Sequence, residues 1–219
     1  FGESKMTGAE REKLQKQRLA EMKVYENNLR AQGINYIGGV DEGGRGPLAG
    51  PVVAACLVLP EDFSVTGVDD SKKVSEKKRN SLYNSILDNS ISWGIGLVAP
   101  EIIDEINILN ATKKAMTIAI DAAKEKCDLQ HLLIDAVSLE EIDIPQTSII
   151  KGDAKSVSIA AASIVAKVYR DNLMINYSKE YPGYAFEKNK GYGTKAHYEG
   201  ISEKGITPIH RKSFLKKIL

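Results

Sequence analysis

Acidic side chains follow three apolar runs of this 219-residue chain, and they are the residues best suited to chemistry. They are Asp41, Glu42, Asp135 and Asp153. A single aspartate at the end of a strand is ordinary, because Asp is common in turns. Three acidic strand ends favour a shared site, because carboxylates at adjacent strand ends repel each other unless cations join them. Hard divalent cations prefer carboxylate oxygen, so the pattern favours a metal site.

The first two carboxylates lie in a glycine-rich segment, residues 36–51 (YIGGVDEGGRGPLAGP). The apolar start of this segment predicts the end of a buried strand, which delivers the carboxylates into a turn. Glycines permit positive φ and let a ligand lie directly on the backbone. Residues 44–49 also fit G-x-G-x-x-A, but that dinucleotide fingerprint requires a helix after the glycines. Here prolines precede the valine-rich run of residues 52–59, which predicts a strand and argues against a nucleotide fold.

Residues 41–51 (DEGGRGPLAGP) resemble the first motif of the type 2 ribonucleases H. The GRG triplet at residues 44–46 is similar to ribonuclease HII rather than HIII, which usually has threonine in the middle. Gly43 departs slightly from the family pattern, in which alanine or valine is common. The resemblance runs in order from Tyr36 to Phe214, and the N-terminal helical segment lies outside the best-matched region.

Two later acidic motifs also resemble this family, DA at residues 135–136 and GDAKS at residues 152–156. The resemblance implies that the four carboxylates hold two Mg²⁺ or Mn²⁺ ions about 4 Å apart, the arrangement used for phosphodiester cleavage. One metal ion would orient and help deprotonate the attacking water, and the other would stabilise the leaving 3′-oxygen. The implied catalytic and metal-binding residues are Asp41, Glu42, Asp135 and Asp153.

An enzyme that acts on RNA within DNA must detect a 2′-hydroxyl group. The backbone of the GRG triplet could do so at close range, and DSKK at residues 70–73 resembles a family motif that contacts phosphate. The resemblance implies that Tyr192 packs on the deoxyribose 3′ of the ribonucleotide, whereas spacing alone favours an aromatic packed in the core or a loop. The predicted substrate-binding residues are Gly44, Arg45, Gly46, Lys72 and Tyr192.

Charge is unevenly distributed along a chain whose net charge is only +1. Residues 1–100 are balanced, residues 101–150 hold 4 basic and 10 acidic side chains, and residues 151–219 hold 13 basic and 6 acidic ones. An acidic centre with a basic tail suits a metal site beside a phosphate-binding surface. Solvated faces of unequal sign would give the same totals.

Composition is ordinary for a globular protein, with 42% hydrophobic and 27% charged residues. No apolar run approaches the ~20 residues of a membrane helix, and no secretory signal is visible. Cys56 and Cys127 have no metal or redox spacing and are expected to be buried, reduced thiols. These features predict a cytoplasmic location without membrane contact.

Strands alternate with helices, which predicts an α/β domain around a mixed sheet. The resemblance implies a ribonuclease H-like mixed β-sheet flanked by helices. Residues 1–34 are predicted to form an N-terminal helical extension, whose first residues, FGESK, are set aside as an added or truncated end. Residues 35–219 form the predicted catalytic domain, with a helical, basic substrate-binding region from about residue 181. The predicted strands cover residues 36–40, 52–59, 91–98, 131–137 and 147–150, and helical patterns begin at Ser75, Pro100, Asn110 and Ser158.

Several local expectations depend on spacing alone. A capping box at residues 7–10 opens a helix whose loose apolar stripe favours docking on the core over binding a partner. Asp70 or Ser71 is expected at the entry of the helix that follows. Residues 211–218 are predicted to form a short basic helix. His197 and His210 could contact phosphate, but without a motif a packed or exposed position is favoured.

The resemblance implies a metal-dependent endonuclease that cuts 5′ to ribonucleotides in RNA–DNA hybrids and in duplex DNA with a single embedded ribonucleotide. It would leave 3′-hydroxyl and 5′-phosphate ends, act as a monomer, and serve ribonucleotide excision repair and RNA primer removal. Three alternatives stay open. Another two-metal nuclease or phosphatase would need no 2′-hydroxyl, and a non-catalytic nucleic-acid-binding module would keep its affinity without metal. A type 1 ribonuclease H would need longer RNA tracts, and its motif order fits less well.

Overall fold

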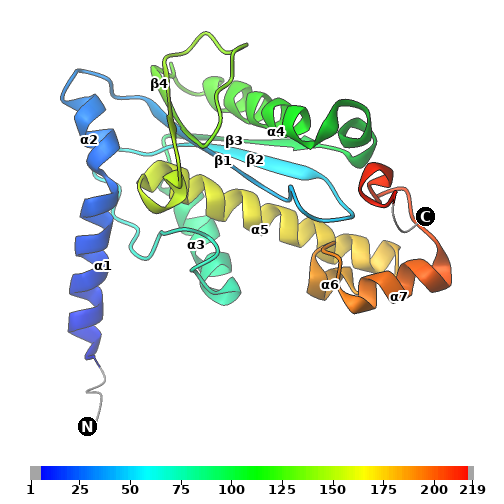
Figure 1. Cartoon of the computed structure of the whole chain (residues 1–219). Helices are drawn as coiled ribbons and strands as arrows, with labels where there is room; N and C mark the ends of the chain where they lie inside the picture. The colour runs from blue at the N-terminus through cyan, green and yellow to red at the C-terminus, as the bar shows by residue number, and fades with distance from the viewer. Residues whose placement is uncertain (1–5, 217–219) are drawn as a thin grey trace.

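The computed structural model describes residues 6–216, which form a mixed sheet between layers of helices (Figure 1). The helices are α1 (Gly8–Met22), α2 (Val24–Arg30), α3 (Glu76–Asp88), α4 (Pro100–Lys124), α5 (Val157–Glu180), α6 (Phe186–Asn189) and α7 (Lys195–Lys204). The strands are β1 (Ile37–Gly43), β2 (Val52–Val58), β3 (Ser92–Val98), β4 (His131–Asp135) and β5 (Gln146–Ile149). Two 3-10 helices complete the described chain, η1 (Gly152–Ala154) and η2 (Lys212–Phe214).

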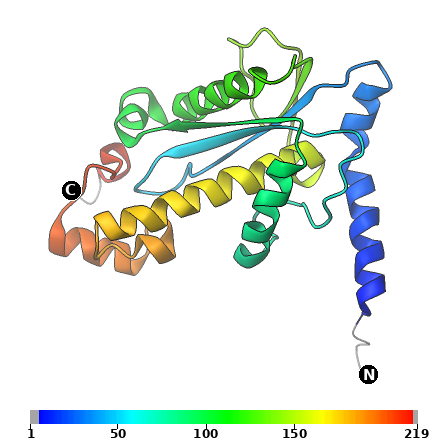
Figure 2. The same cartoon turned by 180° about the vertical axis from the view of Figure 1, so that it is seen from behind.

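The sheet has the strand order β3-β2-β1-β4-β5. Strand β1 pairs antiparallel with β2 and parallel with β4, so the sheet is mixed, as predicted. Helix α4 covers one face, and α5 crosses the other (Figures 1 and 2). Every predicted strand is present, but β1 continues to Gly43, so Asp41 and Glu42 lie within the strand and not in the following turn.

Small residues allow α5 to cross β1 at close range, as the alanine-rich start of the helix predicts. A Cβ atom on Gly39 would lie 2.1 Å from the backbone carbonyl carbon of Ser158. Ala160, Ala161 and Ala162 on α5 are fully buried. The strand that carries the first carboxylates and the helix that follows the last one are therefore in direct contact.

Helix α4 joins the two helical patterns predicted after Pro100 and Asn110. Its backbone leaves helical geometry at Asn107, where φ is 67° and ψ is 166°. The Asn107 side chain accepts hydrogen bonds from the N–H groups of Leu109 and Asn110, which caps the second segment. The remainder of α4 then packs along β3 through residues such as Met116 and Ile120, both fully buried.

The N-terminal helices begin at the predicted capping box, in which Thr7 and Glu10 bond reciprocally. Leu19 and Met22 are buried in the core cluster shared with β2 and α5, which agrees with docking. Leu14 is 51% exposed, and the first turns of α1 project away from the sheet (Figures 1 and 2). The apolar stripe therefore docks only through its C-terminal part. Within residues 6–216, no helix is both long and apolar enough to cross a membrane.

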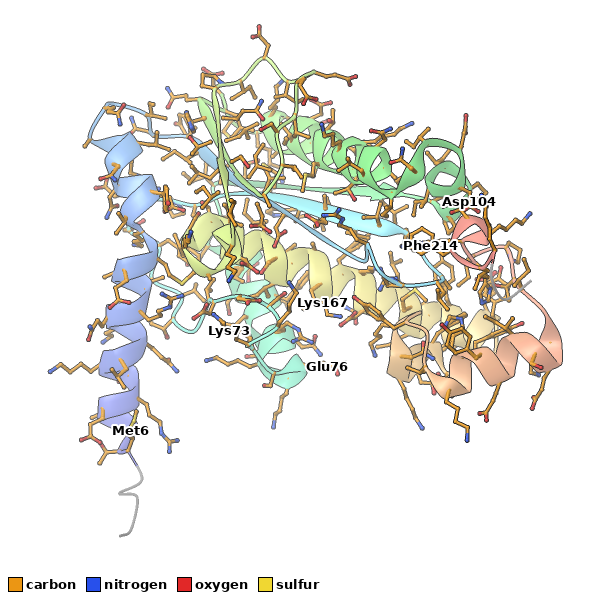
Figure 3. All side chains as sticks on the ribbon, viewed as in Figure 1. Met6, Lys73, Glu76, Asp104, Lys167 and Phe214 are labelled. Carbon is orange, nitrogen blue, oxygen red and sulfur yellow. The ribbon has the colours of Figure 1, made fainter. Side chains whose placement is uncertain are left out.

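Two local predictions are wrong. Ser75 caps α3 by accepting from the Lys78 N–H group, whereas Asp70 lies in an earlier turn and accepts from Lys72. The predicted basic helix at residues 211–218 is reduced to η2, because Asp104 on α4 accepts from the Lys212 and Ser213 N–H groups and fixes a tighter turn there. Asp104 and Phe214 lie close together at this end of the molecule (Figure 3). Residues 217 and 218 of the predicted helix lie outside the described residues.

Candidate active site

The parallel pairing of β1 with β4 brings two predicted site residues together. Val40 pairs with Ile134, so the next residues along the two strands, Asp41 and Asp135, are neighbours across the ladder. Side chains in register on adjacent strands point to the same face of a sheet. For this pair it is the face covered by α5, because Gly39, two residues before Asp41, meets α5 on that side.

Asp153 reaches the same place from the turn after β5. The Gly152 N–H group donates a hydrogen bond of 2.7 Å to Asp135 Oδ1, which ties η1 to the end of β4. A Cβ atom on Gly152 would lie 2.6 Å from the Ile159 side chain of α5 and 3.3 Å from Asp135 Oδ1, so glycine fits closely between the helix and the end of β4. Asp153 itself is 8% exposed and Asp41 is 5% exposed. Asp41, Asp135 and Asp153 therefore lie at the same edge of the sheet, as the resemblance implies.

These carboxylates lie close enough to influence one another's pKa values. Burial raises the pKa of Asp41 well above its usual range, and the charges of Glu42, Asp135 and Asp153 raise it further. Burial also raises the pKa of Asp153, followed by the charges of Asp70 and Asp135. Like charges at short range disfavour ionisation, so this cluster disfavours its own charged state.

Glu42 lies on the same edge with one basic neighbour. Burial raises its pKa, and the charge of Asp135 adds to the effect. The Arg45 guanidinium opposes both through a contact of 3.4 Å with Glu42 Oε1. Lys72 similarly opposes the rise in the pKa of Asp153. Two cations at the rim do not neutralise the group, which leaves it suited to divalent cations.

The donor set fits Mg²⁺ or Mn²⁺ in chemistry, because every candidate ligand is a carboxylate oxygen. Across residues 6–216, however, no three acidic, histidine or cysteine side chains already stand in the arrangement of a metal site. The carboxylates therefore lie at one edge of the sheet without forming a ready-made metal site.

Asp70 is an acidic neighbour of Asp153, although its spacing in the sequence favoured a position at the entry of a helix. Its charge is the largest influence on the pKa of Asp153 after burial. The loop that carries Asp70 and Lys72 therefore lies against the turn that carries Asp153. Only the family-like DSKK run pointed to this loop, and it did so for Lys72.

The GRG loop is held by two buried arginines. Arg211 donates to the carbonyl oxygens of Gly44, Arg45 and Gly50 at 2.6–2.9 Å. In a trans peptide the C=O and N–H bonds point in opposite directions. The N–H groups of Arg45 and Gly46 therefore point away from Arg211.

Arg170 on α5 holds the exit of the same loop. It donates to the carbonyl oxygens of Ala49, Pro51 and Lys190 at 2.9–3.0 Å. Burial lowers the pKa of Arg170 to about 10 and that of Arg211 to about 9. Nothing in the sequence indicated that Arg170 and Arg211 bind this loop. From sequence alone, a buried arginine that binds carbonyl groups looks the same as a basic residue on the surface.

Tyr192 lies beside the GRG loop. A Cβ atom on Gly46 would lie 3.5 Å from the Tyr192 ring, and the Tyr192 side chain is 46% exposed. The ring is therefore neither in the core nor free of the loop. It lies next to the glycine backbone and is partly open to solvent.

A buried histidine pair supports Tyr192 from behind. The Thr207 N–H group donates to His210 Nδ1 at 2.9 Å, so the His210 proton is on Nε2. That nitrogen lies 3.0 Å from His197 Nε2, and His197 Nδ1 lies 2.9 Å from the Tyr192 carbonyl oxygen. Burial lowers the pKa of both rings, that of His210 to about 4, which keeps the pair neutral. The expected packed position of both histidines is correct.

Comparisons with known proteins identify the family that this chain resembles. Residues 38–217 match the family model described as Ribonuclease HII. A curated relative from Clostridioides difficile (strain 630), named Ribonuclease HII, is 55% identical over 205 residues, covering 94% of this chain and 80% of the relative.

Two solved structures share the fold. Ribonuclease H2 from Pyrococcus horikoshii OT3 is 26% identical with a TM-score of 0.68, and the match covers 83% of this chain and 96% of that one. Bst-RNase HIII in complex with Mn²⁺ is 18% identical with a TM-score of 0.58, and the match covers 85% of this chain and 67% of that one.

We expect Asp41→Asn to stabilise the protein in EDTA at pH 7, measured as a higher Tm. A carboxyl whose folded pKa is raised costs stability above that pKa, and the cost disappears as pH falls through it. The advantage of the variant over the wild type should therefore shrink between pH 7 and pH 4. A lower Tm for the variant throughout this range would contradict the mutual repulsion described above.

Proposed function

This chain belongs to the ribonuclease HII family and is a ribonuclease H endonuclease, and we propose that its four clustered carboxylates form the catalytic centre. The observation that carries this proposal is the register of β1 with β4, which sets Asp41 beside Asp135. The turn tied to Asp135 then adds Asp153. A cluster that disfavours its own charge has no evident structural use, because it costs stability in the folded chain.

The proposed cofactor is a pair of divalent ions, Mn²⁺ or Mg²⁺. Bst-RNase HIII, a structural relative, was solved with Mn²⁺. When bound, such ions activate water and stabilise the leaving oxygen of a phosphodiester. The residues proposed to hold them are Asp41, Glu42, Asp135 and Asp153.

The chain's own side chains would place the phosphodiester. Arg45 and Lys72 are the cations nearest the carboxylates, one beside Glu42 and the other beside Asp153. We propose that Lys72 contacts a substrate phosphate at the rim, where its charge offsets the repulsion between carboxylates and backbone phosphates. The nucleophile would be water, since the hydroxyl groups of Ser156 and Ser158 are bonded to Glu26.

The ribose would be read at the GRG loop. The outward N–H groups of Arg45 and Gly46 suit an oxygen acceptor such as the 2′-hydroxyl. Gly46 leaves room for a sugar against the backbone, and the exposed face of Tyr192 would pack on the following deoxyribose. A site that recognises ribose through backbone N–H groups and one aromatic ring would need only a single ribonucleotide, and not an RNA tract.

We therefore propose cleavage 5′ to a ribonucleotide, in RNA–DNA hybrids and at single ribonucleotides in duplex DNA, with 3′-hydroxyl and 5′-phosphate products. We further propose that the catalytic domain is residues 35–219, that residues from about 181 form its substrate-binding region, and that the enzyme works as a monomer. Ribonucleotide removal from DNA is the proposed cellular role.

The reaction can be tested on a labelled duplex with one ribonucleotide and a matched all-DNA duplex, with Mg²⁺, Mn²⁺ or EDTA. We expect metal-dependent cutting 5′ to the ribonucleotide only. Asp135→Asn should lower the rate about 1,000-fold or more, since metal ions supply several kcal/mol of transition-state stabilisation.

The matched control is Asp143→Asn, which changes an exposed aspartate in the loop between β4 and β5 and should cut normally. Equal cutting of both duplexes would show that the enzyme does not recognise the ribose and is a general two-metal nuclease. Binding without cutting by the wild type would indicate a nucleic-acid-binding module.

Tyr192→Ala should slow cleavage at a single embedded ribonucleotide about 10- to 100-fold, the range expected for loss of one aromatic stack. Tyr192→Phe keeps the ring and should cut at nearly the wild-type rate. Single-turnover rates on the same duplex measure both variants. A Phe variant as slow as the Ala variant would mean that the hydroxyl group, and not the ring, carries the contact.

A further inference from the structure

Two side chains connect the N-terminal helices to the edge of the sheet where the carboxylates meet. Arg18 lies on α1 and Glu26 on α2, in the segment outside the region matched by the family model. Arg18 is half-buried and Glu26 is 1% exposed. Neither charge belongs on an outer solvated face.

Arg18 joins two loops of the proposed active site. Its Nε and Nη2 atoms donate to the Asp69 carboxylate at 3.0 and 3.2 Å. Nη2 also donates to the Ala154 carbonyl oxygen at 2.8 Å. Asp69 precedes Asp70, and Ala154 follows Asp153. One guanidinium therefore binds both loops directly beside their acidic residues.

Glu26 fixes the other end of the Asp153 turn. Its Oε1 atom accepts from the Ser156 hydroxyl at 2.6 Å and from the Ser158 N–H group at 3.0 Å, and also from the Ser158 hydroxyl. These serines form the first turn of α5, where a negative charge is favourable. Among residues 6–216, no group donates a hydrogen bond to the second oxygen, Oε2. All side-chain hydrogen bonds of Glu26 within these residues therefore go to this turn.

The Asp153 turn is tied to the rest of the molecule from two sides. From the sheet side, the Asp153 turn is tied by the bond from Gly152 to Asp135. Arg18 and Glu26 supply the ties on the outer side.

Besides these two side chains, α1 contacts the core through Leu19 and Met22 near its C-terminal end. A groove of about 450 Å³ lies between α1 and the segment that enters α3, lined by Leu14, Arg18, Asp69 and Lys73 among others. Figure 3 shows Lys73 between the two helices. The Leu14 side chain at this groove is largely exposed, so the outer half of α1 adds little apolar packing against the Asp70–Lys72 loop.

We propose that Arg18 and Glu26 are positioning residues of the active site, which hold the Asp153 turn against the Asp70–Lys72 loop. The N-terminal helices then complete the catalytic edge instead of forming a separate module. This inference rests on the proposed function in one respect, the assignment of Asp153 as a metal ligand.

The test measures Mn²⁺ binding by calorimetry and cleavage kinetics on the single-ribonucleotide duplex, using the full chain. Arg18→Ala should weaken Mn²⁺ binding about 10-fold, the usual effect of losing a residue that orients a ligand. It should lower kcat and leave KM unchanged, because Arg18 does not touch the substrate. The matched control is Lys16→Ala on the same helix. Within residues 6–216 Lys16 pairs only with Glu12 one turn away, so this change should alter neither quantity.

Glu26 provides a second, independent variant. Glu26→Gln keeps the Oε1 acceptor and should bind Mn²⁺ like the wild type, whereas Glu26→Ala should lose affinity. Asp69→Asn covers the case in which Arg18→Ala does not fold, because it weakens the same link from the other side. Circular dichroism at the assay temperature establishes that each measured variant is folded.

Unchanged Mn²⁺ affinity in folded Arg18→Ala and Glu26→Ala would overturn the inference. A raised KM with normal kcat in Arg18→Ala would also overturn it, because Arg18 would then bind substrate. A wild type that binds Mn²⁺ but leaves the ribonucleotide duplex intact would refute the proposed function instead. In that case the Mn²⁺ affinities of the variants still decide the inference.

Discussion

The parallel pairing of β1 with β4 places two aspartates next to each other inside the mixed sheet. Backbone hydrogen bonds, which are indifferent to side-chain charge, force Asp41 and Asp135 onto neighbouring positions of one face. Burial raises the pKa of Asp41, and the charges of Glu42 and Asp135 raise it further. The hydrogen bond from Gly152 to Asp135 brings in Asp153, and the bonds from Arg18 and to Glu26 hold the Asp153 turn in place.

Hydrogen bonds to backbone groups give the site its shape. Arg211 and Arg170 bind carbonyl oxygens of the GRG loop and its exit, and so determine which way the N–H groups of that loop point. The histidine pair does the same for the chain at Tyr192. Ribose reading, as proposed, therefore depends on a rigid backbone whose supports are buried away from the ligand.

The sequence predicted the strands and the acidic residues that follow them, because apolar runs and turn residues are local signals. It did not show by itself that the strands of Asp41, Asp135 and Asp153 are neighbours; the family resemblance supplied that, and the register agrees. The extent of β1 was missed because carboxylates within a strand look like its end.

Long-range contacts of charged residues were beyond prediction. Arg170, Arg211 and Glu26 bind groups between 20 and 167 positions away in the chain, and no periodicity encodes such partners. Asp70 or Ser71 was expected at the entry of a helix because such residues are common there, but Ser75 takes that place and Asp70 lies near Asp153.

The Tm of the protein in rising Mn²⁺, compared with that of Asp135→Asn, shows whether cations bind the carboxylate cluster. A cluster of carboxylates that repel one another until cations join them predicts a rising Tm, equivalent to about 2.7 kcal/mol when Mn²⁺ reaches 100 times its Kd, and little rise in the variant. An unchanged Tm, or an equal rise in both proteins, would contradict it.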